Sequence, residues 1–375
     1  GEMMFRNIVL PVLFSIAMLF AAGAVADDTV PSADPAVQTL IKKIGLREAE
    51  VASRDLEGWS PPKKIVVRRL PVGSLEDLQS VAPGVEIVMV DTREQAVEES
   101  VDAQGIVGMC VEEILSGSPE LFWVQVYTAG VDRCVPLPGI RKGHKLLTNG
   151  QRIGSPALAE HAIAMMMALA RGLDVYHSNQ IKGEWHREAG LSRSDHMELE
   201  GRTLLVVGLG GIGTQVAKRG HGLGMRVIAT RNSRREGPEY VDYVGLSDEL
   251  HELASQADVV INTVPLTEQT RGLFNAGFFE AMKTNAFFVS VGRGGSTVTD
   301  DLVAALDAGS IAGAGLDVTD PEPLPEGHVL WSMPRVIISP HVAGRSDKGL
   351  NRLYLMIKEN IRRYVAGEPM LSVVD

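Results

Sequence analysis

The sequence predicts an α/β protein built from two doubly wound parallel sheets. Three observations support this fold class: a first series of short apolar strands alternating with helices, a second such series, and a glycine-rich turn where the second series begins. The chain has 375 residues, of which 45% are hydrophobic and 22% charged. This length exceeds one typical hydrophobic core, and the composition is that of a globular protein, so we expect two domains.

The first series occupies residues 64–147. Apolar runs predict strands over 64–70, 85–90, 105–110, 123–127 and 144–147, and helical patterns lie between them at 74–81, 93–100 and 111–116. A helical stretch over 37–54 precedes this series, and an amphipathic helix over 346–366 ends the chain. We therefore expect a flavodoxin-like domain made of residues 27–149 and 345–375.

A hinge and a long apolar helix connect the two series. Residues 149–155 predict the hinge, and Pro156 lies in the first turn of a helix that runs to about Ala170. Because this helix is apolar nearly all round, we expect it to be buried, either in the core or at a subunit interface. Residues 171–201 are polar and show no clear periodicity.

The second series begins with a glycine-rich turn. Residues 203–220 read T-L-L-V-V-G-L-G-G-I-G-T-Q-V-A-K-R-G, which is a strand pattern, a turn and a helix pattern. Gly208 permits a tight bend, Gly210 lets the backbone approach a pyrophosphate, and Gly213 lets helix and strand pack closely. A turn without a ligand is the alternative, but a second strand at 225–229 completes a βαβ unit and favours nucleotide binding. Further strands are expected at 258–263, 286–291, 312–316 and 335–339, which together give a Rossmann domain over residues 150–344.

The end of the second Rossmann strand indicates which cofactor binds. An acidic residue that hydrogen-bonds the ribose hydroxyls of NAD normally occupies this position. This chain instead has Thr230, Arg231, Asn232 and Ser233, followed by two more arginines. A guanidinium pairs with a phosphate, whereas an acid would repel it, so we expect NADP(H) to be preferred and NAD(H) to be accepted. The alternative is a merely exposed basic turn.

Three later strands end in residues that could carry chemistry. Arg293 follows the first of them, Asp317 and Glu322 the second, and His341 the third. In an open parallel sheet these strand ends all face the ligand crevice. An imidazole exchanges protons near neutral pH, a carboxylate can hold it in its charged form, and an arginine can polarise a carbonyl. The other eight of the nine histidines lie in no comparable setting and show no metal-ligand spacing, so we expect no metal.

From about residue 62 to 366 the chain resembles the D-isomer-specific 2-hydroxyacid dehydrogenases. The motifs that carry this resemblance are the glycine-rich turn and the segments V-G-R-G-G, G-L-D-V-T-D-P-E-P and S-P-H-V-A-G, in this order. The resemblance implies that Arg293 binds substrate, that Glu322 pairs with His341, and that His341 donates the proton. It also implies that the amides of Ala129 and Gly130, in a loop over 128–132, bind the substrate carboxylate.

The resemblance extends to the cofactor and to assembly. Asp317 would contact the nicotinamide carboxamide, and the apolar helix with residues 171–201 would form a homodimer. The expected cofactor-binding residues are Gly208, Gly210, Gly211, Ile212, Gly213, Thr230, Arg231, Asn232, Ser233, Thr263, Val264, Pro265, Thr270, Val291, Gly292, Asp317, His341 and Gly344.

These observations predict an NADP(H)-dependent reductase of a 2-oxo acid such as glyoxylate, hydroxypyruvate or a larger analogue. The alternative is a cofactor-sensing binding protein of the same fold that does not turn over. A net charge of −11 argues against a nucleic-acid partner.

The N-terminal residues predict export. Arg6, an apolar run and Ala24-Val25-Ala26 together resemble a signal peptide over residues 1–26, with an uncleaved membrane anchor as the alternative. A misassigned start would instead leave the protein cytoplasmic, where a nicotinamide pool is expected. Export would allow a disulfide between Cys110 and Cys134, but two separate small buried residues are the preferred interpretation.

Overall fold

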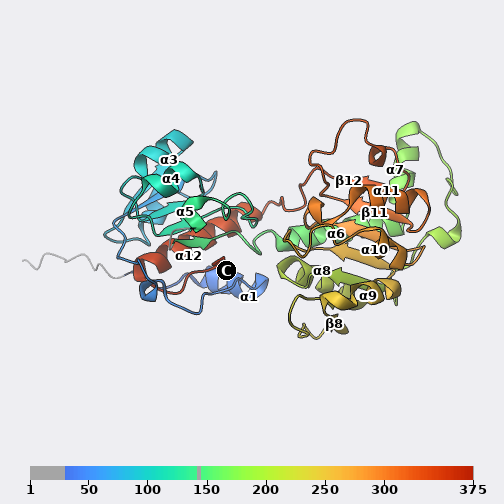
Figure 1. Ribbon diagram of the computed structural model, residues 1–375, viewed down its shortest axis with the longest axis horizontal. Coiled ribbons are helices and arrows are strands. Elements are labelled where there is room, and N and C mark those ends of the chain that lie inside the picture. Colours follow the sequence, from blue (N-terminus) through green and yellow to red (C-terminus); the bar gives the residue numbers. More distant parts are fainter. Residues whose placement is uncertain (1–29, 142–144, 375) are drawn as a thin grey trace, which may run out of the picture.

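The computed structural model describes residues 30–141 and 145–374, and these form two α/β lobes (Figure 1). Both lobes contain a parallel sheet covered by helices on its two faces, which confirms the expected fold class. The segment expected to be a signal peptide or anchor lies outside the described residues. Within the described part of the chain, no helix is both long and apolar enough to cross a membrane.

The first lobe contains a five-stranded sheet in the order β2-β1-β3-β4-β5, the flavodoxin order. Ile65 and Val67 of β1 point into one core, and Val66 between them points into the other. This alternation follows from the two-residue period of a strand. The strands are β1 (Lys64–Arg68), β2 (Glu86–Val90), β3 (Gly105–Val107), β4 (Trp123–Gln125) and β5 (Leu146–Thr148). The helices are α1 (Pro35–Ile44), α2 (Leu75–Gln79), α3 (Arg93–Glu99), α4 (Glu112–Gly117), α5 (Pro138–Arg141) and α12 (Gly349–Ala366).

The second lobe contains a seven-stranded sheet in the order β12-β11-β10-β9-β6-β7-β8, a Rossmann arrangement extended by one strand. Leu204 and Val206 of β6 pack against the α6 and α8 side, and Leu205 and Val207 face α9, α10 and α11. The strands are β6 (Thr203–Val207), β7 (Arg226–Thr230), β8 (Tyr243–Gly245), β9 (Val259–Asn262), β10 (Phe287–Ser290), β11 (Gly313–Leu316) and β12 (Val336–Ile338). The helices are α6 (Ser155–Ala170), α7 (Leu173–Lys182), α8 (Gly211–Gly222), α9 (Leu250–Gln256), α10 (Ala276–Ala281) and α11 (Thr299–Asp307).

One sequence-based expectation about the elements is wrong, and two elements were not expected. The helix expected over 37–54 ends at Ile44, because Gly45 adopts a left-handed φ of 67° and caps it. The polar segment 171–201 contains α7, bracketed by Gly172 and Gly183, both with positive φ. Strand β8 was not expected, since it is only three residues long and lies at the sheet edge.

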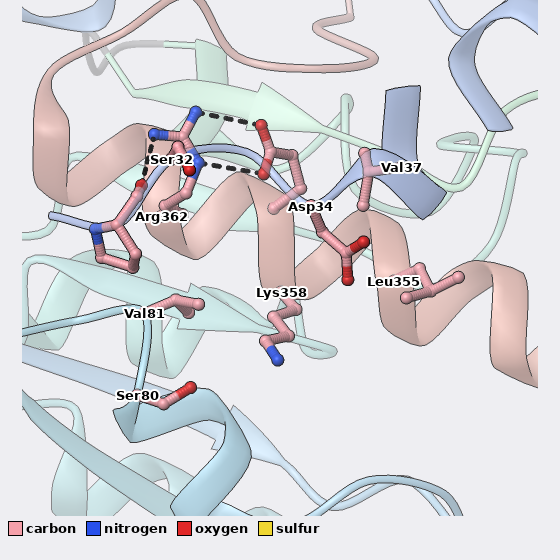
Figure 2. Close-up of a pocket in the computed structure, with 10 residues that line it drawn as sticks. Ser32, Asp34, Val37, Ser80, Val81, Leu355, Lys358 and Arg362 are labelled. Carbon is pink, nitrogen blue, oxygen red and sulfur yellow. Dashed lines mark hydrogen bonds and ion pairs between the residues drawn. The ribbon is translucent and has the colours of Figure 1, made fainter. Parts of the chain in front are cut away.

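Helix α12 returns to the first lobe after the last strand of the second (Figure 1). Its Tyr364 is fully buried, with its ring centroid 5.1 Å from that of Trp123. A pocket of about 210 Å³ lies between this helix and the residues that lead into α1 (Figure 2). Its two cations are already paired, Arg362 with Glu359 and Lys358 with Asp77, so the pocket is a feature of packing in the first lobe.

Cys110 and Cys134 form a disulfide, so the preferred interpretation of two separate buried residues is wrong. Their Cα atoms lie 5.7 Å apart, within the usual span of such a bond. The disulfide joins the segment after β3 to the residues that follow the expected substrate loop. Spacing alone could not reveal this pairing, because the two positions are brought together by the sheet.

Candidate active site

The residues expected to carry the chemistry follow three neighbouring parallel strands. Arg293 follows β10, Asp317 and Glu322 follow β11, and His341 follows β12. Because parallel strands present their carboxyl ends at one edge, these side chains belong to one side of the sheet. The structure therefore collects the expected catalytic residues at a single edge.

His341 and Glu322 form a short hydrogen-bonded pair. His341 Nδ1 lies 2.6 Å from Glu322 Oε1, and the two side chains are 44% and 42% exposed. Nε2 of the ring makes no hydrogen bond to any residue in the described part of the chain, so it is open to an incoming molecule. A carboxylate on one ring nitrogen orients the imidazole and leaves the other nitrogen available for proton transfer to a bound molecule.

The loop that carries His341 is fixed by Asp317. The backbone of His341 has a φ of 54°, a left-handed conformation that is strained for a residue other than glycine. Asp317 Oδ1 accepts from the amide of Val342 at 2.9 Å, and Oδ2 accepts from that of Ala343 at 3.0 Å. The His341 amide donates to the Asp317 carbonyl at 2.8 Å. These contacts make Asp317 a positioning residue for the histidine, and its expected contact with nicotinamide stays a prediction.

His161 belongs to the same network, contrary to the expectation that the other histidines lie in no comparable setting. Ser339 Oγ donates to Asp317 Oδ1 at 2.6 Å and lies 2.8 Å from His161 Nε2. Because the serine proton is given to the carboxylate, the serine oxygen accepts from the histidine, which therefore carries its proton on Nε2. The available signal in the sequence was a histidine next to Glu160 in the mostly apolar helix α6.

Arg293 and the expected substrate loop meet across the two lobes. A Cβ on Gly130 would lie 2.4 Å from Arg293 Nη2, so the guanidinium lies directly against the loop at this glycine. Asn149 Nδ2 donates to the Ala129 carbonyl at 2.7 Å and holds the loop in place. Within residues 30–141 and 145–374, the amides of Ala129 and Gly130 donate to no protein acceptor. Two free N–H groups beside a guanidinium are the donors that a carboxylate requires.

Asn262 supports Arg293 and was not expected from the sequence. It is fully buried at the end of β9, and its Nδ2 donates to Ser290 Oγ at 3.0 Å and to Ser296 Oγ at 2.9 Å. Ser296 Oγ in turn donates to the Arg293 carbonyl at 2.6 Å. An asparagine inside an apolar strand could have been noticed, but its partners become visible only when the strands are aligned.

The glycine-rich turn leaves an open backbone surface at the start of α8. Gly208 has a φ of 92°, and a Cβ on Gly213 would lie 2.2 Å from the Gly208 carbonyl oxygen. Among the described residues, a Cβ on Gly210 would meet nothing within 4 Å, and no side chain caps the helix. Open space before an uncapped helix N-terminus fits the pyrophosphate of a dinucleotide.

The expected adenosine end of the site is cationic. Thr230 is buried and its Oγ1 accepts from the Gly208 amide at 3.3 Å, whereas Asn232 and Ser233 are exposed. Arg231 is half-buried, and its buried Nε has no hydrogen-bond partner in the part of the chain that the structure describes. Burial and then the charge of Arg234 lower the pKa of Arg231, with Glu236 acting in the opposite direction.

Arg235 points elsewhere. It pairs with Glu249 at 2.7 Å, and this contact, more than any other, lowers the pKa of Glu249 to about 2. Of the three arginines after β7, Arg235 is therefore committed to a protein partner, and Arg231 is the one left with an unsatisfied buried nitrogen among the described residues.

The remaining expected cofactor residues surround the turn or the loops beside it. Thr263 Oγ1 donates to the Gly208 carbonyl at 2.7 Å, and Thr270 Oγ1 donates to the Pro265 carbonyl at 2.6 Å. A Cβ on Gly292, which follows the buried Val291, would lie 2.6 Å from the Val264 carbonyl oxygen. Gly344 packs near Gly154 at the start of α6. Their contacts with a cofactor stay predictions.

The Rossmann sheet has an open glycine turn, and a histidine–carboxylate pair and an arginine follow its neighbouring strands. This combination defines a nicotinamide-dependent oxidoreductase. Comparison with known proteins agrees. Residues 163–343 match the family model described as D-isomer specific 2-hydroxyacid dehydrogenase, NAD binding domain. The chain belongs to the D-isomer-specific 2-hydroxyacid dehydrogenase family.

Two relatives share most of their length with this chain. A glyoxylate reductase of Pyrococcus furiosus is 30% identical over 84% of this chain and 95% of its own length. A glycerate dehydrogenase of Methylorubrum extorquens is 30% identical over 70% of this chain and 82% of its own. The crystal structure of an NADPH-dependent glyoxylate/hydroxypyruvate reductase from Sinorhizobium meliloti, in complex with NADP and sulfate, superposes with a TM-score of 0.70 at 28% identity, covering 84% of this chain and 98% of that one. The protein is accordingly an NAD(P)-dependent oxidoreductase of small 2-hydroxy and 2-oxo acids.

Proposed function

We propose that this protein is an NADP(H)-dependent reductase of a small 2-oxo acid, with glyoxylate and hydroxypyruvate as the first candidates. The observation that carries the cofactor preference is Arg231, half-buried after β7, with an Nε that has no partner among the described residues and no acid at the strand end. A 2′-phosphate would supply the missing counter-charge. The glyoxylate and hydroxypyruvate reductases among the relatives support the substrate class.

The proposed reaction uses groups that are already oriented. Arg293 and the amides of Ala129 and Gly130 hold the substrate carboxylate, and Arg293 polarises the ketone. The bound nicotinamide supplies the hydride. His341 donates a proton from Nε2 to the oxygen that becomes the hydroxyl, while Glu322 holds the Nδ1–H and stabilises the charged ring.

The test is NADPH oxidation by the purified protein with a panel of 2-oxo acids that includes glyoxylate, hydroxypyruvate and larger analogues. Turnover with at least one of them, and faster with NADPH than with NADH, is expected. Tight NADPH binding without turnover of any member would overturn the proposal and support a cofactor-sensing protein instead.

We also propose that the protein is a homodimer formed through α6, α7 and the residues that follow. Leu173, Ile181 and Trp185 are 54%, 75% and 92% exposed, an unusual display of large apolar side chains. Light scattering should give twice the chain mass, and a monomer at micromolar concentration would contradict the assembly.

Finally, we propose that the chain is exported and cleaved after Ala26. The Cys110–Cys134 disulfide supports this localisation, because such bonds persist in oxidising compartments. N-terminal sequencing of the native protein should begin at Asp27. A retained leader would favour the anchor, and a start downstream of the apolar run that leaves the protein cytoplasmic would contradict export.

A further inference from the structure

Arg152 lies on the glycine-rich turn although it belongs to the segment between β5 and α6. A Cβ on Gly211, the first residue of α8, would lie 2.8 Å from Arg152 Cγ. A Cβ on Gly45, which caps α1 in the first lobe, would lie 2.9 Å from Arg152 Nη1. The side chain therefore extends from the start of the phosphate-facing helix to the end of α1.

The backbone of Arg152 is held in a conformation that suits glycine better. Its φ is 70°, which costs free energy for any residue with a Cβ. The segment is fixed on both sides: the Gly150 amide donates to the Thr128 carbonyl at 2.9 Å, and Arg352 Nη1 donates to the Ile153 carbonyl at 3.0 Å. A strained position that retains a long cationic side chain indicates a role for that side chain.

The charge of Arg152 is not balanced by the described residues. Burial, and then the neighbouring guanidiniums of Arg47 and Arg231, lower its pKa, and none of the described carboxylates acts in the opposite direction. Arg47 also lies near enough to Arg231 to lower the pKa of that residue. Three guanidiniums from both lobes are thus close enough to repel one another, and the Arg152 side chain lies beside Gly211 at the start of α8. An anion bound there would relieve the repulsion.

We propose that Arg152 is a cofactor-binding residue that pairs with the pyrophosphate of the nicotinamide dinucleotide, with Arg47 adding positive potential from the first lobe. This inference rests on dinucleotide binding at the glycine-rich turn and not on the preference for NADP(H). Arg231, at the ribose end, distinguishes the two cofactors. Arg152 contacts the phosphates that both cofactors share, so it contributes equally to the binding of each.

The test is fluorescence titration of the full protein with NADPH and with NADH. Arg152→Gln should raise both Kd values about tenfold or more and by a similar factor, because a charge-assisted phosphate contact is lost. The Kd for ADP should rise by a similar factor, whereas the Kd for 2′-AMP, which lacks the pyrophosphate, should not change. Arg226→Gln is the matched control, since Arg226 is exposed at the opposite end of β7 from Arg231.

A second variant separates binding from folding. Arg152→Gly removes the same side chain but suits the positive φ, so its Tm should equal or exceed that of the unmodified protein while the loss of affinity persists. Kd values within twofold of the unmodified protein for both cofactors would overturn the assignment, and so would a loss confined to NADPH and 2′-AMP. If the unmodified protein preferred NADH while Arg152→Gln still weakened both cofactors, only the proposed NADP(H) preference would fail.

Discussion

The two ligand-facing regions of the seven-stranded sheet differ in how their charges are balanced. At the catalytic end, which comprises the residues after β10, β11 and β12, the protein supplies partners: Glu322 for the ring of His341, and three hydrogen-bond donors for the carboxylate of Asp317. At the phosphate end, which comprises the glycine-rich turn, Arg231 and Arg152, the two guanidiniums are partly buried and lie close enough to repel each other.

The two ends have different requirements before the ligand binds. A proton donor must be oriented in advance, so its partners are built into the fold. A charged group that only binds the cofactor needs no partner in the free protein, because the cofactor supplies the counter-charge. Substitutions at the catalytic end should therefore reduce kcat, and substitutions at the phosphate end should reduce cofactor affinity.

The largest effect is expected for His341→Ala. Without the proton donor, kcat should fall about a thousandfold, within the usual range for general acid catalysis. The Kd for NADPH should stay unchanged, because the phosphate end is intact. Steady-state rates and fluorescence titration measure the two quantities, with His251→Ala, an exposed histidine of α9, as the control. Normal turnover in His341→Ala would refute the role.

At the other end, Arg231→Asp should reverse the choice of cofactor. The Kd for NADPH should rise about a hundredfold, since an attractive charge is replaced by a repulsive one beside the 2′-phosphate. NADH should bind as well as before or better, because a carboxylate at this place accepts from the ribose hydroxyl. An unchanged ratio of the two Kd values would show that Arg231 does not recognise the 2′-phosphate.

Glu322→Gln tests whether the charge of the carboxylate matters in addition to its shape. The amide can still accept from Nδ1–H of His341, but it stabilises the charged ring less well. We expect kcat to fall about tenfold to a hundredfold, which corresponds to the difference between a charged and a neutral hydrogen-bond partner. A variant with full kcat would mean that the carboxylate only supports the local packing.

Loss of the disulfide should have the smallest effect on catalysis and on cofactor binding, and should act on stability instead. Cys110 and Cys134 are 24 residues apart, and closing a loop of this size stabilises a protein by about 3.5 kcal/mol in the chain-entropy treatment. Reductant should lower the free energy of unfolding of the oxidised protein and leave the Cys110→Ser/Cys134→Ser double variant unaffected. The Kd for NADPH should be the same for the oxidised protein and for the double variant. Equal stability of the unmodified protein with and without reductant would contradict the bond.

The parts of the molecule that depend on neighbouring residues could be predicted from the sequence. The tight bend at Gly208 and the close packing at Gly213 follow from local geometry, and the strand ends that carry Arg293, Glu322 and His341 follow from apolar runs of strand length. The class of fold therefore follows from local patterns along the chain. Short or polar elements such as β8 and α7 do not, because they lack a strong periodic pattern.

The parts that depend on contacts between distant segments could not be predicted. Asp317 lies in a motif, but its hydrogen bonds to the loop of His341 require β11 and β12 to be placed side by side. His161 reaches Ser339 across 178 positions, and Arg152 reaches Gly211 from outside the turn. A sequence motif identifies the groups that react, whereas the groups that position them come from elsewhere in the chain.

The most direct measurement is the ratio of kcat/KM for NADPH to that for NADH, determined on the unmodified protein with glyoxylate or hydroxypyruvate as the second substrate. We predict turnover with both cofactors and a ratio of about ten or more in favour of NADPH, as one charge-assisted contact to the 2′-phosphate would give. A ratio below one, or the absence of turnover with either cofactor, would contradict the proposed NADP(H)-dependent reductase activity.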